Sequence, residues 1–536
     1  MIIEALTSYA HQAWVWSTSS ALHSVIAGVV LLIALVLVQE ARRPAMAGIP
    51  GPFLARYTDL WLTRQAMRGN RSEVVHGLHK KYGRFVRIAP NHVSIADHAA
   101  LNPVYGHGTG SLKADFYDAF AAPTLPRGLF NTRSRPEHSR KRKIVSHTFA
   151  PKSIAAFEPF VRMQIQILVG RLEELSKSSQ DGWYALDVLM WMNYFAFDTI
   201  GSLAFGSTFG MLERGSPEAD VELPTPSGKM EKTTCNAVQI INERGDYSAT
   251  LGVVPPYLRP YAARLPWFSN RLKSVKKLTG IAFAKVNQRL EHGSDREDLL
   301  AKLQAGTDET GQTMGKYELV AESLTQLIAG SDTTSNSATA IIYHLCQHPA
   351  VLKKLRQELD ASLPDDSDEV PLLSDVDSLP YLNAVINESL RVHSTSAIGL
   401  PRLMPQGGVT IDGKHFPEGS VLSVPTYTIH RDPTVWGKDA EEYRPERWLD
   451  AEGKATSKSD LEKSFNPFST GPRVCVGRNL AIPEQQMLIA TLVKRFDFKL
   501  EKPEDDLLVV EGFLRKPVTL PAKVRIRRKG EESVWS

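Results

Sequence analysis

A cysteine lies in a loop made mostly of glycine, proline and polar residues. The loop reads PFSTGPRVCVG over residues 467–477, and its Cys475 is one of three cysteines among 536 residues. A structural cysteine usually lies in an apolar run, so this position indicates chemistry. Gly471 and Gly477 would let backbone N–H groups approach the sulfur, and Arg473 would add positive charge. A helix predicted directly after the loop would also favour a thiolate through its N-terminal dipole.

The number of thiolates limits which metal this loop could hold. One cysteine is too few ligands for structural zinc or an iron–sulfur cluster, but one thiolate is enough for a haem iron. Cys235 and Cys346 are distant in sequence and form no CxxC pair, so a disulfide framework is not indicated either. The alternative is a reactive surface cysteine without a metal. We expect the folded part to face a reducing compartment.

Polar residues also stand inside the long helix that the pattern predicts from Lys316 to His348. The stretch reads LIAGSDTTSN. Gly330 weakens the helix there, and the side chains of Asp332 and Thr333 compete for its backbone hydrogen bonds. Taken alone, the stretch predicts a kinked helix with capped hydroxyl groups.

Charged side chains stand at helical spacing in two further motifs. In ESLR, Glu388 and Arg391 lie at i and i+3 of one helix face, which alone predicts a surface ion pair worth roughly a few tenths of a kcal/mol. In EHSRKR, His138 and Arg142 lie at i and i+4, and Arg447 lies in RPERW.

Together these motifs resemble the cytochrome P450 monooxygenases. The spacing Phe468-x-x-Gly471-x-Arg473-x-Cys475-x-Gly477 is similar to the haem-ligand signature of that family, and LIAGSDTTSN, ESLR and RPERW precede it in the family's order. The resemblance implies a mainly α fold with a smaller β portion. It also implies haem b with an axial cysteine thiolate, dioxygen as co-substrate and electrons that derive from NADPH.

The resemblance further implies which residues serve the haem. Thr333 would hold a water that donates protons during dioxygen cleavage, and Asp332 would link that water to solvent. The haem propionates are anions that need cations or N–H donors, and His138 stands where the family usually has Trp. The implied haem contacts are Cys475, which is also the metal ligand, Arg473, His138, Arg142, Arg402, Phe468 and Gly471. The implied structural network is Glu388, Arg391 and Arg447.

Longer stretches resemble the fungal benzoate para-hydroxylases. They read YGHGTGSLKADFYDAF, RGLFNTRSRPEHSRKRK, LTQLIAGSDTTSN, STSAIGLPR and EGFLRKP. That resemblance implies hydroxylation of benzoate to 4-hydroxybenzoate, with electrons from a separate NADPH–cytochrome P450 reductase and cytochrome b5 as a further donor. The chain lacks a Gly-rich dinucleotide fingerprint, which agrees with a separate donor. It departs from the family at Ala121–Pro126, which is longer and richer in proline, and at Pro483 in the helix after the cysteine.

The substrate class constrains its pocket. Benzoate is an anion with a flat apolar ring, so a dry pocket must pair its carboxylate with a cation or several donors. Holding that end far from the iron would present the para C–H to the oxidant. The residues expected around the ring are Phe116, Tyr117, Phe120, Ala329, Thr395, Ser396, Ala397 and Phe513. The carboxylate partners left open are His107, Lys113, Arg133 and Arg244 and the hydroxyl groups of Ser394, Thr395 and Ser396.

The N-terminal region predicts a membrane anchor. Residues 21–38 read ALHSVIAGVVLLIALVLV, about long enough to cross a bilayer, and two arginines follow at 42–43. A cleaved signal peptide is the alternative, but there is no basic segment before the apolar run. We expect an anchor over 1–43, a proline-rich hinge over 44–52 and a haem-thiolate domain over 53–536. The domain would face the cytosol from the endoplasmic reticulum membrane.

Composition and pattern outline the rest of the chain. It is 42% hydrophobic and 23% charged with a net charge of +4, which indicates a globular protein and argues against a nucleic-acid binder. Period-two alternation predicts a strand pair over 81–97, and a helix is predicted over 152–175. Short strands are expected at 407–413, at 420–427 and near the C-terminus. The stretches at 215–232 and 363–378 predict surface loops.

Other interpretations of the function remain open. The substrate could be a larger or substituted aromatic acid. A reductase-independent haem-thiolate protein that rearranges a peroxide, or a non-catalytic haem sensor, would share the cysteine loop but would give Asp332 and Thr333 no role. Arg140, Lys141 and Lys143 predict either a basic patch for an acidic electron donor or a solvated helix face.

Overall fold

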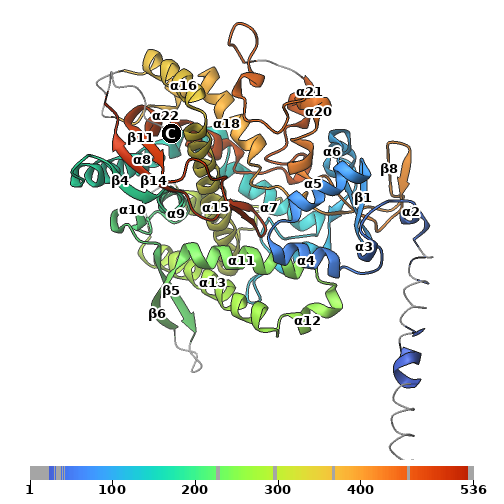
Figure 1. Ribbon diagram of the computed structural model, residues 1–536. Coiled ribbons are helices and arrows are strands. Elements are labelled where there is room, and N and C mark those ends of the chain that lie inside the picture. The colour runs from blue at the N-terminus through green and yellow to red at the C-terminus, as the bar shows by residue number, and fades with distance from the viewer. Residues whose placement is uncertain are drawn as a thin grey trace, which may run out of the picture.

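The computed structural model describes residues 23–28, 30–31, 38, 40, 43–224, 230–293, 298–364, 369–455 and 459–528. Helices make up most of these residues, and the strands form small sheets (Figure 1). Half of the apolar run at 21–38, and most of the anchor predicted over 1–43, lies outside them. Among the helices that can be described, none combines the length and the apolar character that a bilayer crossing requires.

Several helices precede the central one along the chain. They are α2 (Pro44–Ala47), α3 (Phe53–Tyr57), α4 (Leu60–Arg68), α5 (Arg71–Tyr82), α6 (Leu101–Tyr105), α7 (Arg135–Thr148), α8 (Pro151–Ser178), α9 (Val188–Phe205), α10 (Met211–Arg214), α11 (Ala237–Gly252), α12 (Arg259–Ala262), α13 (Pro266–His292) and α14 (Leu299–Ala305). The prediction of a helix over 152–175 is confirmed by α8.

The later helices begin with the central one. They are α15 (Lys316–Gln347), α16 (Pro349–Ser362), α17 (Leu373–Val376), α18 (Pro380–Val392), α19 (Thr426–Ile429), α20 (Pro433–Trp436), α21 (Ser459–Ser464) and α22 (Arg478–Arg495). Single 3₁₀ turns occur at η1 (His98–Ala100), η2 (Asp115–Phe120), η3 (Pro256–Leu258), η4 (Pro445–Trp448) and η5 (Gly471–Arg473). The predicted long helix is confirmed by α15, and Pro349 starts the next helix because proline suits a first helical turn.

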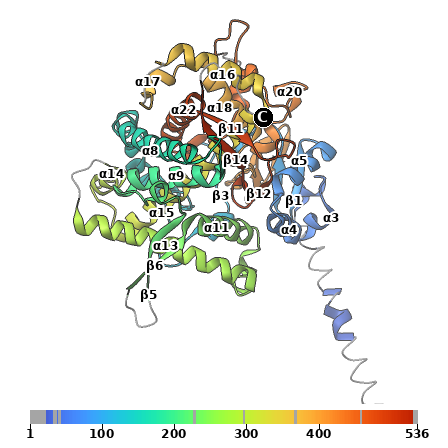
Figure 2. The ribbon, with the colours of Figure 1, turned by 60° about the vertical axis from the view of Figure 1, so that its left-hand side comes forward.

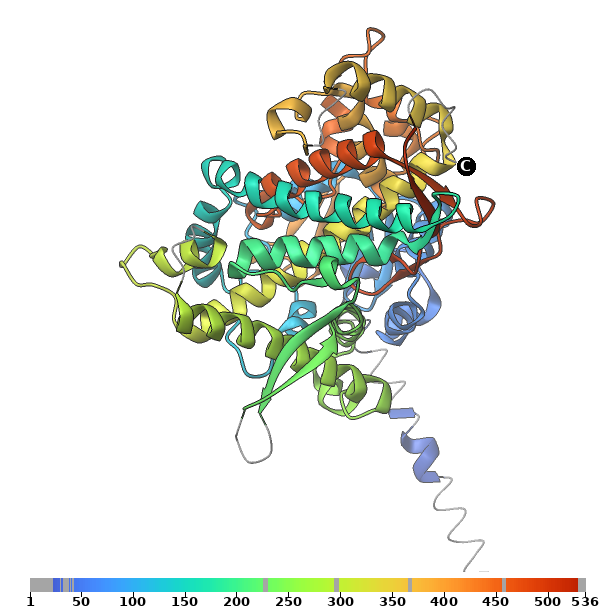
Figure 3. The same cartoon turned by 90° about the vertical axis from the view of Figure 1, so that its left-hand side faces the viewer.

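The core is built around α15 and α9. Figure 1 shows α15 running through the middle of the molecule, and Figure 3 shows α8 between α9 and α22. The sequence of α9 is apolar on every side, so nearly all of it is buried. Gly330 of α15 faces α9, where a Cβ atom would lie 2.8 Å from Ile200. Close helix packing is therefore a reason for the glycine in LIAGSDTTSN.

The main sheet has the strand order β1-β2-β10-β7-β3. Its strands are β1 (Phe85–Ala89), β2 (His92–Ile95), β3 (Leu112–Lys113), β7 (Arg402–Leu403) and β10 (Val421–Ser423). The predicted strand pair is confirmed, because β1 and β2 pair antiparallel with Phe85 opposite Ile95. At the other edge, β3 and β7 place Lys113 opposite Arg402.

The remaining strands form smaller sheets. They are β4 (Tyr184–Asp187), β5 (Glu218–Pro224), β6 (Met230–Asn236), β8 (Val409–Ile411), β9 (Lys414–Phe416), β11 (Phe496–Leu500), β12 (Val509–Glu511), β13 (Arg515–Pro517) and β14 (Pro521–Ile526). The order is β11-β14-β4 in one sheet, and β5-β6, β8-β9 and β12-β13 are two-stranded. The short strands predicted at 407–413, at 420–427 and near the C-terminus are confirmed by β8, β10 and β14.

The prediction of a surface loop over 215–232 is wrong. This stretch forms most of the β5–β6 hairpin, which projects beside α13 (Figure 2). Ala219 and Val221 alternate along β5 and are buried, and Gly280 of α13 lets the strand approach, since a Cβ atom there would lie 2.6 Å from the backbone oxygen of Glu222. The second predicted loop, 363–378, contains α17, whose Val376 is buried.

The segment predicted as a hinge packs on the main sheet in the structure. Met46 and Ile49 are each 1% exposed and belong to the same apolar cluster as Val93 and Leu422. The N–H of Arg87 donates to the backbone oxygen of Pro50 at 2.8 Å. Residues 44–52 are therefore held against the domain.

Candidate functional site

The cysteine loop is held closed by its own backbone. The N–H of Cys475 donates to the oxygen of Phe468 at 2.9 Å, and Val474 N–H donates to the oxygen of Gly471 at 3.0 Å. Gly471 has φ of 74°, and a Cβ atom there would lie 1.9 Å from the oxygen of Tyr105. Glycine is required at this position by its backbone and by close packing against α6.

The surroundings of Cys475 act on its thiol in two opposing ways. Burial raises the pKa of Cys475, whereas the N–H groups of Gly477 and Arg478 and the charge of Arg142 act to lower it. The net direction is upward, although the Cys475 side chain is itself exposed, and the backbone N–H donors that the sequence predicts around the sulfur do act towards the thiolate. These donors lessen the effect of burial without overcoming it. A coordinated metal ion would supply the further positive charge that deprotonates a thiol.

Four cations lie beside the loop, and we call them the open cation cluster: Lys113, Arg142, Arg402 and Arg473. Arg142 Nη1 donates to the oxygen of Val474 at 2.7 Å, and Arg473 Nη1 donates to the oxygen of Thr132 at 3.1 Å. Arg402 is 2% exposed, and its Nη1 donates to the Tyr117 hydroxyl at 2.9 Å. Its buried Nη2 has no hydrogen-bond partner.

The charges of the open cation cluster repel one another. Burial and the charge of Arg402 lower the pKa of Arg473 to about 10 and hold that of Lys113 well below its usual range. Burial and the charge of Arg473 lower the pKa of His138 to about 3, so its ring is neutral. Within the described residues, no member of the cluster is in ion-pair contact with a carboxylate. Such a cluster fits a ligand with two negative charges, as the propionates of a haem are.

A second group of buried charges is fully paired, and we call it the closed network: Glu388, Arg391, Arg447 and Asp439. Arg391 donates to both oxygens of Glu388 at 2.8 Å, and Arg447 Nε donates to Glu388 Oε1 at 2.8 Å. Arg447 also lies 3.3 Å from Asp439. Glu388 and Arg391 are both 0% exposed. The three residues that the sequence predicts as a network are thus in contact, and they tie α18 to η4.

The polar stretch of α15 does not interrupt the helix. Thr333 Oγ1 donates to the oxygen of Ala329 at 2.6 Å, which satisfies the hydroxyl inside the helix, and α15 is continuous there. The predicted capping of a hydroxyl group within the helix is therefore confirmed for Thr333. Ala329 is exposed and Thr333 half-buried, although the helix lies in the core, so this face borders an internal space. Asp332 is buried, and burial raises its pKa.

A buried acid follows the cysteine on α22. Glu484 is 5% exposed, and Thr334 of α15 donates to its Oε2 at 3.4 Å. Burial raises the pKa of Glu484 to about 8. Pro483 directly precedes it, inside α22, where it removes one helical N–H donor.

Aromatic side chains gather between η2 and the β12–β13 turn, and we call them the aromatic cluster: Phe116, Tyr117, Phe120, Phe130 and Phe513. The ring centroids of Phe120 and Phe513 are 4.8 Å apart, and Phe130 lies 5.5 Å from Phe120 and 5.4 Å from Phe513. The sequence analysis missed Phe130. Its position directly before NTRSRPEH, in a stretch used for the resemblance, is the signal that could have indicated it.

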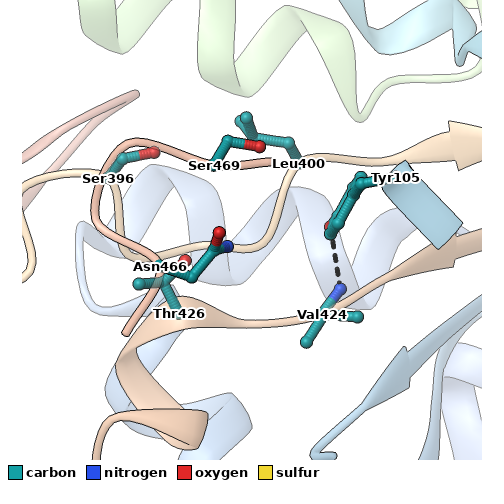
Figure 4. A pocket seen from close by; sticks show the side chains of 7 residues that line it. All are labelled: Tyr105, Ser396, Leu400, Val424, Thr426, Asn466 and Ser469. Atoms are coloured by element: carbon teal, nitrogen blue, oxygen red, sulfur yellow. Dashed lines mark hydrogen bonds between the residues drawn. The ribbon is translucent and has the colours of Figure 1, made fainter. Parts of the chain in front are cut away.

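The residues that follow ESLR, which the sequence predicts to contact the substrate, lie in different surroundings. Ser394 donates within its own turn and contacts His430 Nδ1 at 2.8 Å, and Thr395 Oγ1 lies 3.4 Å from Ser337 of α15. Ala397 is fully buried. Ser396 lines a small pocket beside the cysteine loop (Figure 4), together with Tyr105, Leu400, Val424, Thr426, Asn466 and Ser469.

The cations considered as carboxylate partners, and those considered as a basic patch, differ in their exposure and in their ion pairs. His107 is exposed, Arg133 is paired with Asp118 at 2.8 Å, and Arg244 lies on α11 near Phe120. Lys141 is fully buried against Glu318 and Glu322. An exposed patch that includes Lys141 is therefore ruled out.

Two neighbours of Lys141 on α7, Arg140 and Lys143, differ in their surroundings. Arg140 pairs with Glu137 and Glu318, while Lys143 is exposed.

The departure at Ala121–Pro126 is a surface turn in which Pro123, Thr124 and Pro126 are exposed and Leu125 is buried. Leu125 therefore packs inward, while the two prolines and Thr124 of this turn face solvent.

The comparisons with known proteins agree with this geometry. The family model described as Cytochrome P450 matches residues 50–524. The chain belongs to the cytochrome P450 family. It is 47% identical over 514 residues to benzoate 4-monooxygenase of Aspergillus niger, which covers 94% of this chain and 97% of that protein. It is also 32% identical to a cytochrome P450 monooxygenase of Aspergillus flavus, over 91% of this chain and 94% of the relative.

A further relative within the P450 family has a different printed activity. The chain is 32% identical to pisatin demethylase of Fusarium vanettenii, over 84% of this chain and 85% of that protein. The chain is a cytochrome P450 monooxygenase of the type of benzoate 4-monooxygenase. Membership of the family implies a haem-thiolate cofactor, and the cysteine loop with the open cation cluster fits that group.

Proposed function

We propose that this P450 hydroxylates benzoate at the para carbon to give 4-hydroxybenzoate. The observation that carries the proposal is the 47% identity to benzoate 4-monooxygenase over 94% of the chain. The aromatic cluster supports it, because a flat apolar substrate ring packs well against aromatic edges and faces. A larger or substituted aromatic acid is the alternative substrate.

Each functional group of the site has a role in this proposal. Haem b, bound through Cys475, supplies the activation of dioxygen. Arg142, Arg402 and Arg473 hold its propionates as cations, and His138 does so as a neutral ring N–H donor. Thr333 holds a water near the reacting centre, and Asp332 exchanges protons between that water and solvent. Glu388, Arg391 and Arg447 position the cysteine loop.

The substrate pocket is formed by residues from four parts of the chain. Phe116, Tyr117 and Phe120 come from η2, Ala329 from α15, and Phe513 from the β12–β13 turn. Thr395, Ser396 and Ala397 lie on the segment after α18. Excluding water around the ring leaves only the carboxylate polar, so its partner fixes which ring carbon faces the haem.

Electrons reach this P450 from NADPH through a separate reductase, with cytochrome b5 as a further donor. The apolar run at 21–38 anchors the chain in the endoplasmic reticulum membrane, and residues 1–43, 44–52 and 53–536 are the anchor, the link and the catalytic domain. The arginines at 42–43 support an orientation with the catalytic domain in the cytosol.

Reconstitution with a P450 reductase tests the activity. The purified protein should convert benzoate to 4-hydroxybenzoate only when NADPH, reductase and dioxygen are all present, and chromatography would identify the product. Cys475→Ser should abolish both turnover and the red-shifted carbon monoxide band of a thiolate-bound haem. Turnover of a larger aromatic acid, with no turnover of benzoate, would show that the larger acid is the substrate. Turnover of a peroxide without reductase, or no turnover by a haem-loaded protein, would favour the isomerase or the sensor.

A further inference from the structure

Arg244 is one of the carboxylate partners that the sequence leaves open, and the site described above gives it no other role. It lies half-buried on α11, and its Nη2 donates to the backbone oxygen of Phe120 at 3.3 Å. Burial lowers its pKa to about 10, while attraction to Asp332 opposes that shift. Among the residues that the structure describes, no carboxylate is in ion-pair contact with it. A desolvated guanidinium without a contacting anion is costly, so its position indicates an anionic ligand.

An aromatic surface lies directly beside this guanidinium. Arg244 Cζ is 5.6 Å from the ring centroid of Phe120, and Phe120 contacts the rings of Phe130 and Phe513. Phe130 and Phe513 are only half-buried within the aromatic cluster, so part of each ring is open to contact. A flat ring that bears a carboxylate matches the rings and the guanidinium together.

The other cations considered for this role are engaged elsewhere. Arg133 is paired with Asp118 at 2.8 Å, and His107 is exposed. Lys113 belongs to the open cation cluster and donates to the backbone oxygen of Phe130. Lys113 is also buried and, within the part of the chain that the structure describes, without a contacting carboxylate, but it lies among the arginines of the open cation cluster, whereas Arg244 lies outside that cluster beside Phe120.

Asp332 of α15 attracts Arg244 without being in ion-pair contact with it. Asp332 is buried and also interacts with Lys516 and Asn336. The guanidinium therefore keeps most of its five N–H donors for another partner.

We propose that Arg244 binds the carboxylate of the aromatic acid, with the ring held against Phe120 and Phe513. This inference rests on the proposed function for the class of its substrate. A guanidinium fork binds both carboxylate oxygens and so fixes the axis of the ring. Arg244 is then a residue that determines both affinity for the acid and the position of hydroxylation.

The test compares benzoate with its neutral analogue benzamide on the haem-loaded protein. Dissociation constants come from the shift of the haem spectrum and, independently, from equilibrium dialysis. Arg244→Gln should weaken benzoate binding about ten- to hundredfold, the value of a hydrogen bond to a charged group, and change benzamide binding less than about twofold. Arg133→Gln, at the rival arginine, should leave both constants unchanged.

A lysine at the same position gives a partial rescue. Arg244→Lys keeps the charge without the fork, so it should bind benzoate better than Arg244→Gln and should raise the share of products hydroxylated away from the para carbon. If Arg244→Gln does not fold, the lysine variant carries the test by its product distribution.

Three results would overturn the inference. Equal loss of benzoate and benzamide in Arg244→Gln would mark a packing role, and unchanged benzoate binding would place the carboxylate elsewhere. Loss of benzoate binding in Arg133→Gln would identify that arginine instead. A wild-type protein that binds no benzoate would contradict the proposed function itself, which distinguishes that failure from failure of the assignment of Arg244.

Discussion

The closed network and the open cation cluster both bury arginines, but their charge balance is opposite. In the closed network, two guanidinium groups face the carboxylates of Glu388 and Asp439. In the open cation cluster, one lysine and three arginines lie together without a contacting carboxylate in the part of the chain that the structure describes. Both groups lie close to residues of the P450 signature.

The difference separates a structural site from a binding site. A buried cation that is paired within the chain stabilises only the fold, because no charge is left for a ligand. A buried cation without an anion lowers the stability of the chain until a ligand of opposite charge binds. Charge balance among buried residues therefore indicates which arginines of this P450 serve the cofactor.

The largest expected effect is at the acid of the closed network. Glu388→Gln leaves two buried guanidinium groups without their carboxylate, and we expect it to reduce the free energy of unfolding by about 3–5 kcal/mol. The midpoint of urea unfolding and the soluble yield would measure this. The control is Glu174→Gln, because Glu174 pairs with Arg171 at the same i,i+3 spacing but is 65% exposed; we expect it to change stability by less than about 1 kcal/mol. Equal effects of the two variants would contradict the comparison.

A cation of the open cluster should behave in the opposite way. Arg473→Gln removes a charge that repels Arg402, so the haem-free protein should keep or gain stability. Haem affinity should fall about ten- to hundredfold with the loss of one hydrogen bond to a charged group. Transfer of haem to excess apomyoglobin would measure the loss, with exposed Lys143→Gln as the control. A haem-free protein as weakened as Glu388→Gln, with normal haem retention, would show that the cluster is structural.

Glu484 is a buried carboxylate that forms no ion pair within the described residues, so it tests the effect of an unpaired buried acid on stability. Burial raises its pKa to about 8, so the folded state keeps a proton that the unfolded state loses above the ordinary pKa of Glu. Stability should fall as pH rises from that value towards about 8, by about 1.4 kcal/mol per pH unit. Glu484→Gln should remove this slope while keeping the contact with Thr334. Identical pH dependence of unfolding in both proteins would contradict the assignment.

The sequence predicted the features that depend on local spacing. The cysteine loop, the long helix over Lys316–Gln347 and the first strand pair follow from motif and period alone, because each is specified within one segment. Glu388, Arg391 and Arg447 were grouped through the family resemblance, and the structure brings them into contact.

The sequence could not predict features that depend on partners distant in the chain. Arg133 and Arg244 are equivalent as residue types, and only the fold shows Asp118 beside Arg133 and Phe120 beside Arg244. Lys141 was assigned to an exposed face because its acidic partners lie far along the chain on α15. The β5–β6 hairpin was missed because the apolar alternation of β5 has meaning only against α13.

The register of β3 and β7 has a consequence for the life of the protein in the cell. Lys113 stands directly opposite Arg402 in a pair of strands only two residues long, and like charges opposite each other weaken such a pair. Without a bound anion, this edge of the main sheet should be among the first places to open. Amide exchange at residues 112–113 would then report cofactor loading, and newly made chains that lack haem would expose this edge to proteases first.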